Sequence, residues 1–132
     1  MVVCYTRRMD GRLKADGRFW LTLDGRNFLG RGRVELLQRI RETGSIAKAA
    51  RIMKMSYKAA WDAVDAVNSA WGRPLVASDP AGSRLTPDAE QLIAAYQKAE
   101  ARHAAFMRKL AQDLPVRGMT NRAGPDPVHE KS

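Results

Sequence analysis

The sequence predicts a mainly helical domain that carries a small β-hairpin and continues into a long C-terminal helix. Apolar residues recur at helical spacing in three consecutive segments between residues 33 and 71. Two short extended segments follow, separated by a loop that is rich in turn-forming residues. A last apolar stripe at helical spacing runs from residue 87 to residue 114. A chain of 132 residues has room for one such domain with extra terminal sequence.

The N-terminal part is expected to hold a flexible basic arm over residues 1–16, before a domain that spans residues 17–86. Residues 18–24 (RFWLTLD) predict a β-strand, because they are rich in aromatic and branched side chains and end at the Asp24–Gly25 turn signal. Residues 25–32 are glycine-rich and basic, and no element is predicted for them.

Three helices follow, and each has a local signal at its ends. The first is predicted to end at Gly44, since glycine is common just after the last helical residue. Ser45 is a good N-cap for a second, short helix that reaches about Met53. Ser56 caps a third helix, which ends at Gly72 with a proline close behind.

The second and third helices are rich in small residues where they would cross, namely Ala47, Ala49, Ala50, Ala59 and Ala60. Apolar residues support the crossing from behind, namely Ile46, Ile52, Val64 and Val67. Such a tight pair resembles the helix-turn-helix, whose second helix enters the DNA major groove. Between residues 44 and 60 there are basic residues and no acidic one: Lys48, Arg51, Lys54 and Lys58. The alternative is an ordinary three-helix core with solvated lysines.

Residues 75–77 and 84–86 predict the two strands of a hairpin, with the loop at residues 78–83. The full order is then a strand, three helices, a hairpin and a long helix. This order is the plan of a winged helix-turn-helix domain with an appended helix, and it strengthens the prediction of DNA binding.

The last helix is predicted over residues 87–114, with Thr86 as N-cap and Pro87 in the first turn. It carries a heptad-like stripe that could seal against a second chain: Leu92, Ile93, Tyr96, Ala99, His103, Phe106, Met107 and Leu110. The stripe could instead pack on its own domain, but the helix is longer than such a domain can cover. We therefore predict a dimerisation helix, followed by a disordered tail over residues 115–132.

Two stretches resemble the N-terminal DNA-binding domain of the ModE-type molybdate-responsive regulators. These are GSI followed by AKAA at residues 44–50, and SYKAAWDAV at residues 56–64. The first pattern is shared with the wider LysR-type helix-turn-helix, and the second is more specific to ModE. The resemblance extends from Phe19 to Leu110 and implies DNA binding by a dimer.

The chain departs from that family in two places. Its wing is short, with DPAGS at residues 79–83, whereas the family's wing is usually longer and glycine-rich. Only 18 residues follow Leu114, too few for the family's molybdate-binding domains. We therefore expect no molybdate site in this chain.

The predicted DNA-contacting residues lie at the starts of the second and third helices and at the wing edge: Ser45, Lys48, Arg51, Ser56, Tyr57, Lys58, Trp61, Asp62, Ser83 and Arg84. Ser45 and Lys48 suit phosphate contact, and the opening residues of the third helix would face the groove. Trp61 could instead pack on the first helix or the wing base. Asp62 could accept a hydrogen bond from cytosine, orient Lys58, or point to solvent.

Composition narrows the class of protein. The 23 Lys and Arg against 14 Asp and Glu leave a charge of +9, which favours an anionic partner. The single cysteine excludes an internal disulfide and a multi-cysteine zinc site, and neither a membrane span nor a signal peptide is recognisable. No catalytic motif, metal site or cofactor site is found, so we expect no enzyme and no cofactor.

These observations predict a cytoplasmic, sequence-specific regulator that binds double-stranded DNA as a homodimer on a palindromic operator. Two alternatives stay open. One is a basic architectural protein that binds DNA with little sequence preference. The other is a winged-helix module that binds protein.

Overall fold

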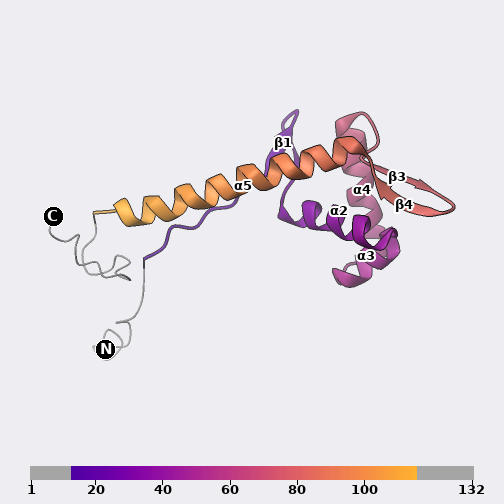
Figure 1. Cartoon of the computed structure of the whole chain (residues 1–132), viewed down its shortest axis with the longest axis horizontal. Coiled ribbons are helices and arrows are strands. Elements are labelled where there is room, and N and C mark those ends of the chain that lie inside the picture. Colours follow the sequence, from indigo (N-terminus) through magenta and orange to yellow (C-terminus); the bar gives the residue numbers. More distant parts are fainter. Residues whose placement is uncertain (1–12, 116–132) are drawn as a thin grey trace, which may run out of the picture. The chain divides into compact units, whose positions relative to one another are not determined.

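The structure, a computed structural model, describes residues 13–115 (Figure 1). The predicted tail, residues 115–132, lies outside this range except for Pro115, and so does most of the predicted arm, residues 1–16. Phe19–Glu100 form one compact unit, and the described residues before and after it belong to a second.

The first elements among the described residues are the two short strands of a hairpin, β1 (Leu21–Leu23) and β2 (Arg26–Leu29). The prediction found the first strand and missed the second. Asp24 and Gly25 both have left-handed backbones, with φ of 53° and 78°, as a two-residue hairpin turn requires. The β2 strand has two exposed residues followed by two buried ones, so it lacks the alternation by which a strand is recognised.

Three helices follow as predicted: α2 (Arg31–Thr43), α3 (Ile46–Ile52) and α4 (Tyr57–Trp71). Gly44 ends α2 with a left-handed backbone, φ 72°. The Ser45 Oγ accepts a hydrogen bond from the Lys48 amide at 3.1 Å, which caps α3. The Ser56 Oγ accepts one from the Ala59 amide at 3.0 Å, which caps α4. These contacts confirm the predicted caps.

The crossing of α3 and α4 uses fewer residues than predicted. Ala49, Ala50 and Ala60 are at most 2% exposed and lie in the core. Ala47 and Ala59 are exposed, because they lie on the outward faces of their helices. Ile52 was also predicted to support the crossing from behind. This prediction is wrong, because the residue is 51% exposed.

The wing is a regular antiparallel hairpin of β3 (Val76–Asp79) and β4 (Gly82–Leu85), which Figure 1 shows extending beyond the helices of its unit. Its strands are longer than predicted, so the turn consists only of Pro80 and Ala81. Asn68 of α4 fixes the approach to the wing: its Oδ1 accepts hydrogen bonds from the amides of Leu75 and Val76, at 2.7 Å and 3.1 Å. This role of Asn68 was not predicted from the sequence.

The wing also docks on the turn between α2 and α3. The Ser83 amide donates a hydrogen bond to the Gly44 carbonyl at 2.9 Å. Gly82 makes this approach possible, because a Cβ at that position would lie 2.7 Å from the Gly44 carbonyl oxygen. Its φ of 138° is also one that other residues rarely adopt.

Gly82→Ala is therefore expected to lower the free energy of unfolding by about 2 kcal/mol, the scale of a strained backbone at a non-glycine residue. Thermal unfolding of the full chain measures it. Gly32→Ala is the matched control, because nothing lies within 4 Å of its added Cβ and its place in α2 favours alanine. A Gly82→Ala protein as stable as the wild type would contradict the docking of the wing.

The long helix α5 (Pro87–Asp113) follows Thr86, whose Oγ1 accepts a hydrogen bond from the Ala89 amide at 3.4 Å. Ile93 and Tyr96 are 2% and 1% exposed, and they complete the core of their own chain. The Tyr96 hydroxyl donates to the Phe19 carbonyl at 3.3 Å. These two members of the predicted dimer stripe therefore pack within the chain and leave almost no surface for a partner. The winged helix-turn-helix fold with a long C-terminal helix is confirmed.

Candidate nucleic-acid interface

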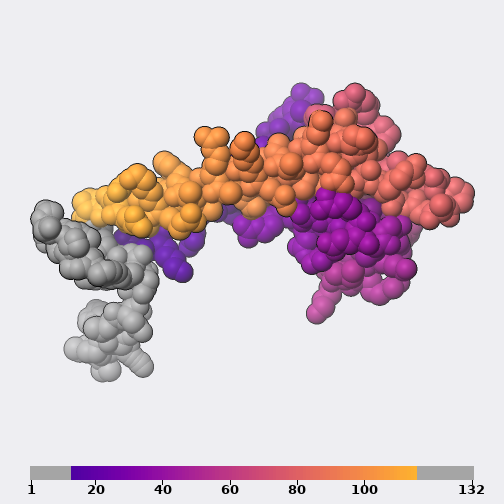
Figure 2. Space-filling view, viewed as in Figure 1, coloured from indigo at the N-terminus to yellow at the C-terminus, as the bar shows by residue number. Residues whose placement is uncertain are grey.

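The start of α3 and the wing edge come together through the contact between Ser83 and Gly44. Ser45 is half-buried and its hydroxyl caps the helix, whereas Lys48 is exposed. Ser83 is half-buried, and its Oγ lies 2.8 Å from the Ser78 Oγ across the hairpin. Figure 2 shows that the wing and the α3–α4 region both reach the molecular surface. The hydroxyls of Ser45 and Ser83 thus make hydrogen bonds within the domain. The exposed cations beside them, Lys48 and Arg84, are the groups available to a ligand.

The first two turns of α4 present an exposed aromatic pair. Tyr57 and Trp61 are 55% and 38% exposed, and their ring centroids lie 6.3 Å apart in an edge-to-face arrangement. Trp61 does not belong to the core cluster. Ser56 caps the helix from the residue before the pair.

Two of the predicted DNA-contacting cations are held in ion pairs. The Lys58 Nζ lies 3.1 Å from the Asp62 Oδ2, one helical turn further on. The Arg84 Nη1 lies 3.0 Å from the Asp79 Oδ2, diagonally across the wing. Of the three roles expected for Asp62, this contact corresponds to the orientation of Lys58. Asp79 was not predicted, because its contact depends on the register of the hairpin.

The local contacts of Asp79 keep it ionised. The amide of Ala81 donates to its Oδ1 at 2.8 Å and, with the Arg84 guanidinium as the next contribution, holds the pKa of this carboxyl below its usual value. Lys48, Arg51 and Lys54 make no ion pair within residues 13–115. The interface therefore holds two kinds of cation, some paired and some free.

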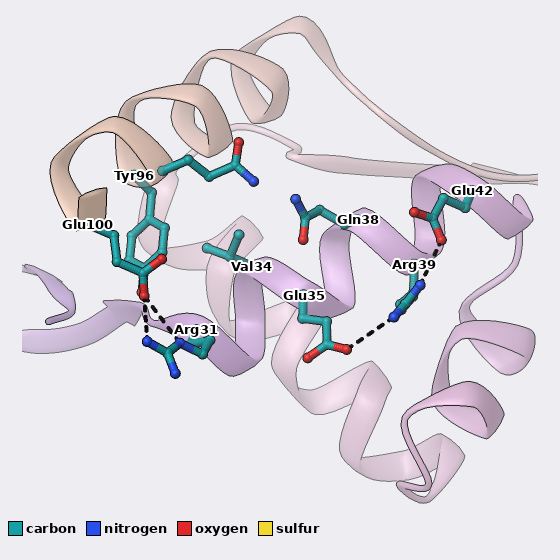
Figure 3. Close-up of a pocket in the computed structure, with 9 residues that line it drawn as sticks. Arg31, Val34, Glu35, Gln38, Arg39, Glu42, Tyr96 and Glu100 are labelled. Carbon is teal, nitrogen blue, oxygen red and sulfur yellow. Dashed lines mark hydrogen bonds and ion pairs between the residues drawn. The ribbon is translucent and has the colours of Figure 1, made fainter. Parts of the chain in front are cut away.

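A second polar surface lies between α2 and α5, in a groove of about 390 Å³. Figure 3 shows Arg31 directed at Glu100 and Arg39 placed between Glu35 and Glu42. The distances are 3.0 Å for Arg31–Glu100, and 3.4 Å and 3.1 Å for the two contacts of Arg39. The hydrogen bond to Glu42 is the main reason why the pKa of Arg39 is raised. These ion pairs engage both arginines of the groove, although the buried Arg39 Nε has no hydrogen-bond partner among the described residues.

The remaining members of the predicted dimer stripe are Leu92, beside Ile93, and five residues further along α5. Phe106 and Leu110 are 62% and 39% exposed, although both are large and apolar. Leu92, Ala99, His103 and Met107 are half-buried. A Cβ at Gly17 would lie 3.2 Å from the Met107 Cε, so the segment before β1 covers that side of the helix.

Among the described residues, no helix is long and apolar enough to cross a membrane. The same residues contain no group of three or more His, Cys, Asp or Glu side chains that could hold a metal ion.

The family model of the bacterial regulatory helix-turn-helix proteins of the lysR family matches residues 32–90. The Molybdenum-pterin-binding protein MopB of Rhodobacter capsulatus is 44% identical over 91 residues, which cover 65% of this chain and 34% of that protein. The Molybdenum transport protein ModE of Azotobacter vinelandii is 33% identical over 102 residues, which cover 74% of this chain and 38% of that protein. The chain thus spans little more than a third of the length of these relatives.

Solved structures of LysR-type regulators share the fold. The complex of the CbnR DBD with DNA superposes with a TM-score of 0.52 at 18% identity, over 63% of this chain and 97% of that one. Full-length CbnR with its target DNA gives a TM-score of 0.53 at 18% identity, over 64% of this chain and 30% of that one.

The family model covers the elements from α2 through the wing to the start of α5. It indicates a helix-turn-helix domain of bacterial regulatory proteins. Residues 32–90 thus match the LysR-type helix-turn-helix model, and the chain is similar over part of its length to the ModE proteins.

Proposed function

We propose that the protein is a sequence-specific transcriptional regulator that binds a palindromic operator as a homodimer. The observation that carries this proposal is the start of α4. An exposed aromatic pair and an exposed lysine open a helix whose N-terminus is fixed by the Ser56 cap, as expected of a helix that enters the major groove. Lys48 and Arg51 on α3 then contact phosphates, which position the protein.

The proposed dimer forms through the distal part of α5, where Phe106 and Leu110 are exposed. Two copies of α4 then address half-sites about 34 Å apart, one turn of DNA. Such a regulator acts where the chromosome lies, so we place the protein in the cytoplasm.

Selection from a random pool of duplexes, followed by sequencing, tests this function. The expected result is an inverted repeat whose half-sites are centred about one helical turn apart. Binding without an enriched motif would favour the architectural alternative, since such a protein discriminates little between sequences at fixed salt. No binding to any duplex at low salt would leave the protein-binding module as the better explanation.

Tyr57 is expected to contact a thymine methyl group, because its ring is exposed at the start of α4 and this methyl is the main apolar feature of the major groove. Tyr57→Ala should then lower discrimination between operator and scrambled DNA more than it lowers overall affinity. The measurement replaces each operator thymine in turn by deoxyuridine, which lacks the methyl group. One replacement should weaken the wild type and leave Tyr57→Ala unchanged. If every replacement affects both proteins equally, Tyr57 does not read that methyl.

A further inference from the structure

Two cations of the proposed DNA interface are paired with carboxylates, and Lys48, Arg51 and Lys54 make no ion pair within residues 13–115. Lys58 and Arg84 lie 3.1 Å and 3.0 Å from Asp62 and Asp79, in pairs that are exposed to solvent on both sides. The pairs form on different elements by different geometries, one along a helix and one across a hairpin. An acidic residue next to DNA repels phosphate, so each carboxylate is costly at this surface unless it serves binding in another way.

We propose that Asp62 and Asp79 set the selectivity of the interface by holding Lys58 and Arg84 until correctly docked DNA replaces the carboxylates. This inference rests on the proposed function. A paired cation adds no net charge to the surface, so it contributes little to the counterion release that drives non-specific binding. Only DNA that presents a base edge or a phosphate at the right place offers the cation a better partner. Asp62 and Asp79 are positioning residues in this scheme, and they act through Lys58 and Arg84.

The energetics suit such an exchange. Exposed ion pairs are weak and are screened by salt, so they can be broken on binding. Each ion pair is nevertheless expected to change the affinity for non-specific DNA by a measurable factor. Lys48, Arg51 and Lys54 carry no such partner among the described residues and attract any duplex equally. The unpaired cations then attract any duplex, whereas Lys58 and Arg84 add to binding only when the DNA is correctly docked.

Asp62→Asn tests the pair on α4. The protein is the full chain, and the probes are the duplex obtained by selection and a scrambled duplex of the same composition. We expect affinity for the scrambled duplex to rise about threefold to tenfold, with a salt slope steeper by about one per half-site. Affinity for the selected duplex should rise less, so the ratio of the two affinities falls.

Asp65→Asn is the matched control. Asp65 lies one turn further along the same side of α4, is exposed, and makes no ion pair within residues 13–115. The Asp65→Asn substitution removes the same charge without releasing a lysine. It should therefore change the affinities for the selected and the scrambled duplex by the same factor. Equal changes of the affinity ratio in Asp62→Asn and Asp65→Asn would overturn the proposal.

A double-mutant cycle shows whether Asp62 acts through Lys58. In a Lys58→Ala background, Asp62→Asn should no longer change the affinity ratio, because no cation remains to be released. A ratio that still falls would overturn the proposed route. Asp79→Asn tests the wing in the same way, and its Oδ1 can still accept the hydrogen bond from Ala81 that holds the turn.

The possible results distinguish a failure of the proposed function from a failure of the proposed role of Asp62 and Asp79. A wild-type protein that selects no motif contradicts the proposed function itself. A wild-type protein that discriminates well, while Asp62→Asn and Asp79→Asn keep its affinity ratio, contradicts only the role of the two carboxylates.

Discussion

Replacing Phe106 and Leu110 together by glutamate is expected to yield a monomer. Both side chains are large, apolar and exposed on α5, and they lie four residues apart on one side of the helix. In the proposed dimer they are buried against a partner helix. Two unpaired carboxylates per chain would then be buried as well, at a cost of several kcal/mol. Light scattering of the purified protein measures the change in mass.

The control places the same charges on the opposite face of the same helix. Ala101 and Ala104 are exposed, and Ala101→Glu with Ala104→Glu adds two carboxylates without touching Phe106 or Leu110. This variant should stay dimeric. A wild type that is monomeric, or a Phe106→Glu/Leu110→Glu variant of unchanged mass, would rule out a dimer through this part of α5.

Lys58→Ala is expected to weaken operator binding by about 1–3 kcal/mol per half-site if Lys58 reads a base. The loss should fall mainly on one operator position, because each side chain addresses one base pair. If Lys58 contacts a phosphate instead, binding to operator and scrambled DNA weakens alike, and the salt slope drops by about one per site. Binding of both duplexes across a salt series distinguishes the two roles.

Lys48→Ala provides the reference for a phosphate contact. Lys48 lies in the first turn of α3, is exposed, and carries no carboxylate partner in the described part of the chain. Its loss should weaken both duplexes equally. If Lys48→Ala and Lys58→Ala both bind like the wild type, the basic surface is ordinary solvated surface and the proposed interface is wrong.

Local signals predicted the helices well. Gly44, Ser45, Ser56 and Gly72 each act on the backbone within a few residues, so their effect can be read from the sequence alone. The β2 strand was missed for the opposite reason. Two of its four residues are exposed and two are buried, and only pairing with β1 reveals it.

Contacts between segments that are far apart in the chain could not be predicted from the sequence. The stripe on α5 identifies an apolar face, but periodicity does not say what covers that face. Tyr96 packs with Phe19, 77 residues away, and so belongs to the core of its own chain. Phe106, on the same stripe, stays exposed. Likewise, the Lys58–Asp62 pair follows from helical spacing, whereas the Arg84–Asp79 pair requires the register of the wing.

The hydrogen bond between Ser83 and Gly44 holds the wing one residue before its last strand pair, Asp79 and Gly82. β4 is thereby joined to the turn that starts α3, so a change of length within the strands would shift the orientation of α3 as well. The two residues of the turn, Pro80 and Ala81, are exposed and lie beyond the last strand pair, Asp79 and Gly82. In the proposed complex, residues inserted between Pro80 and Ala81 would lengthen the reach of the wing along DNA. The turn is therefore the place where the proposed interface could acquire a new footprint while the contact between Ser83 and Gly44 is kept.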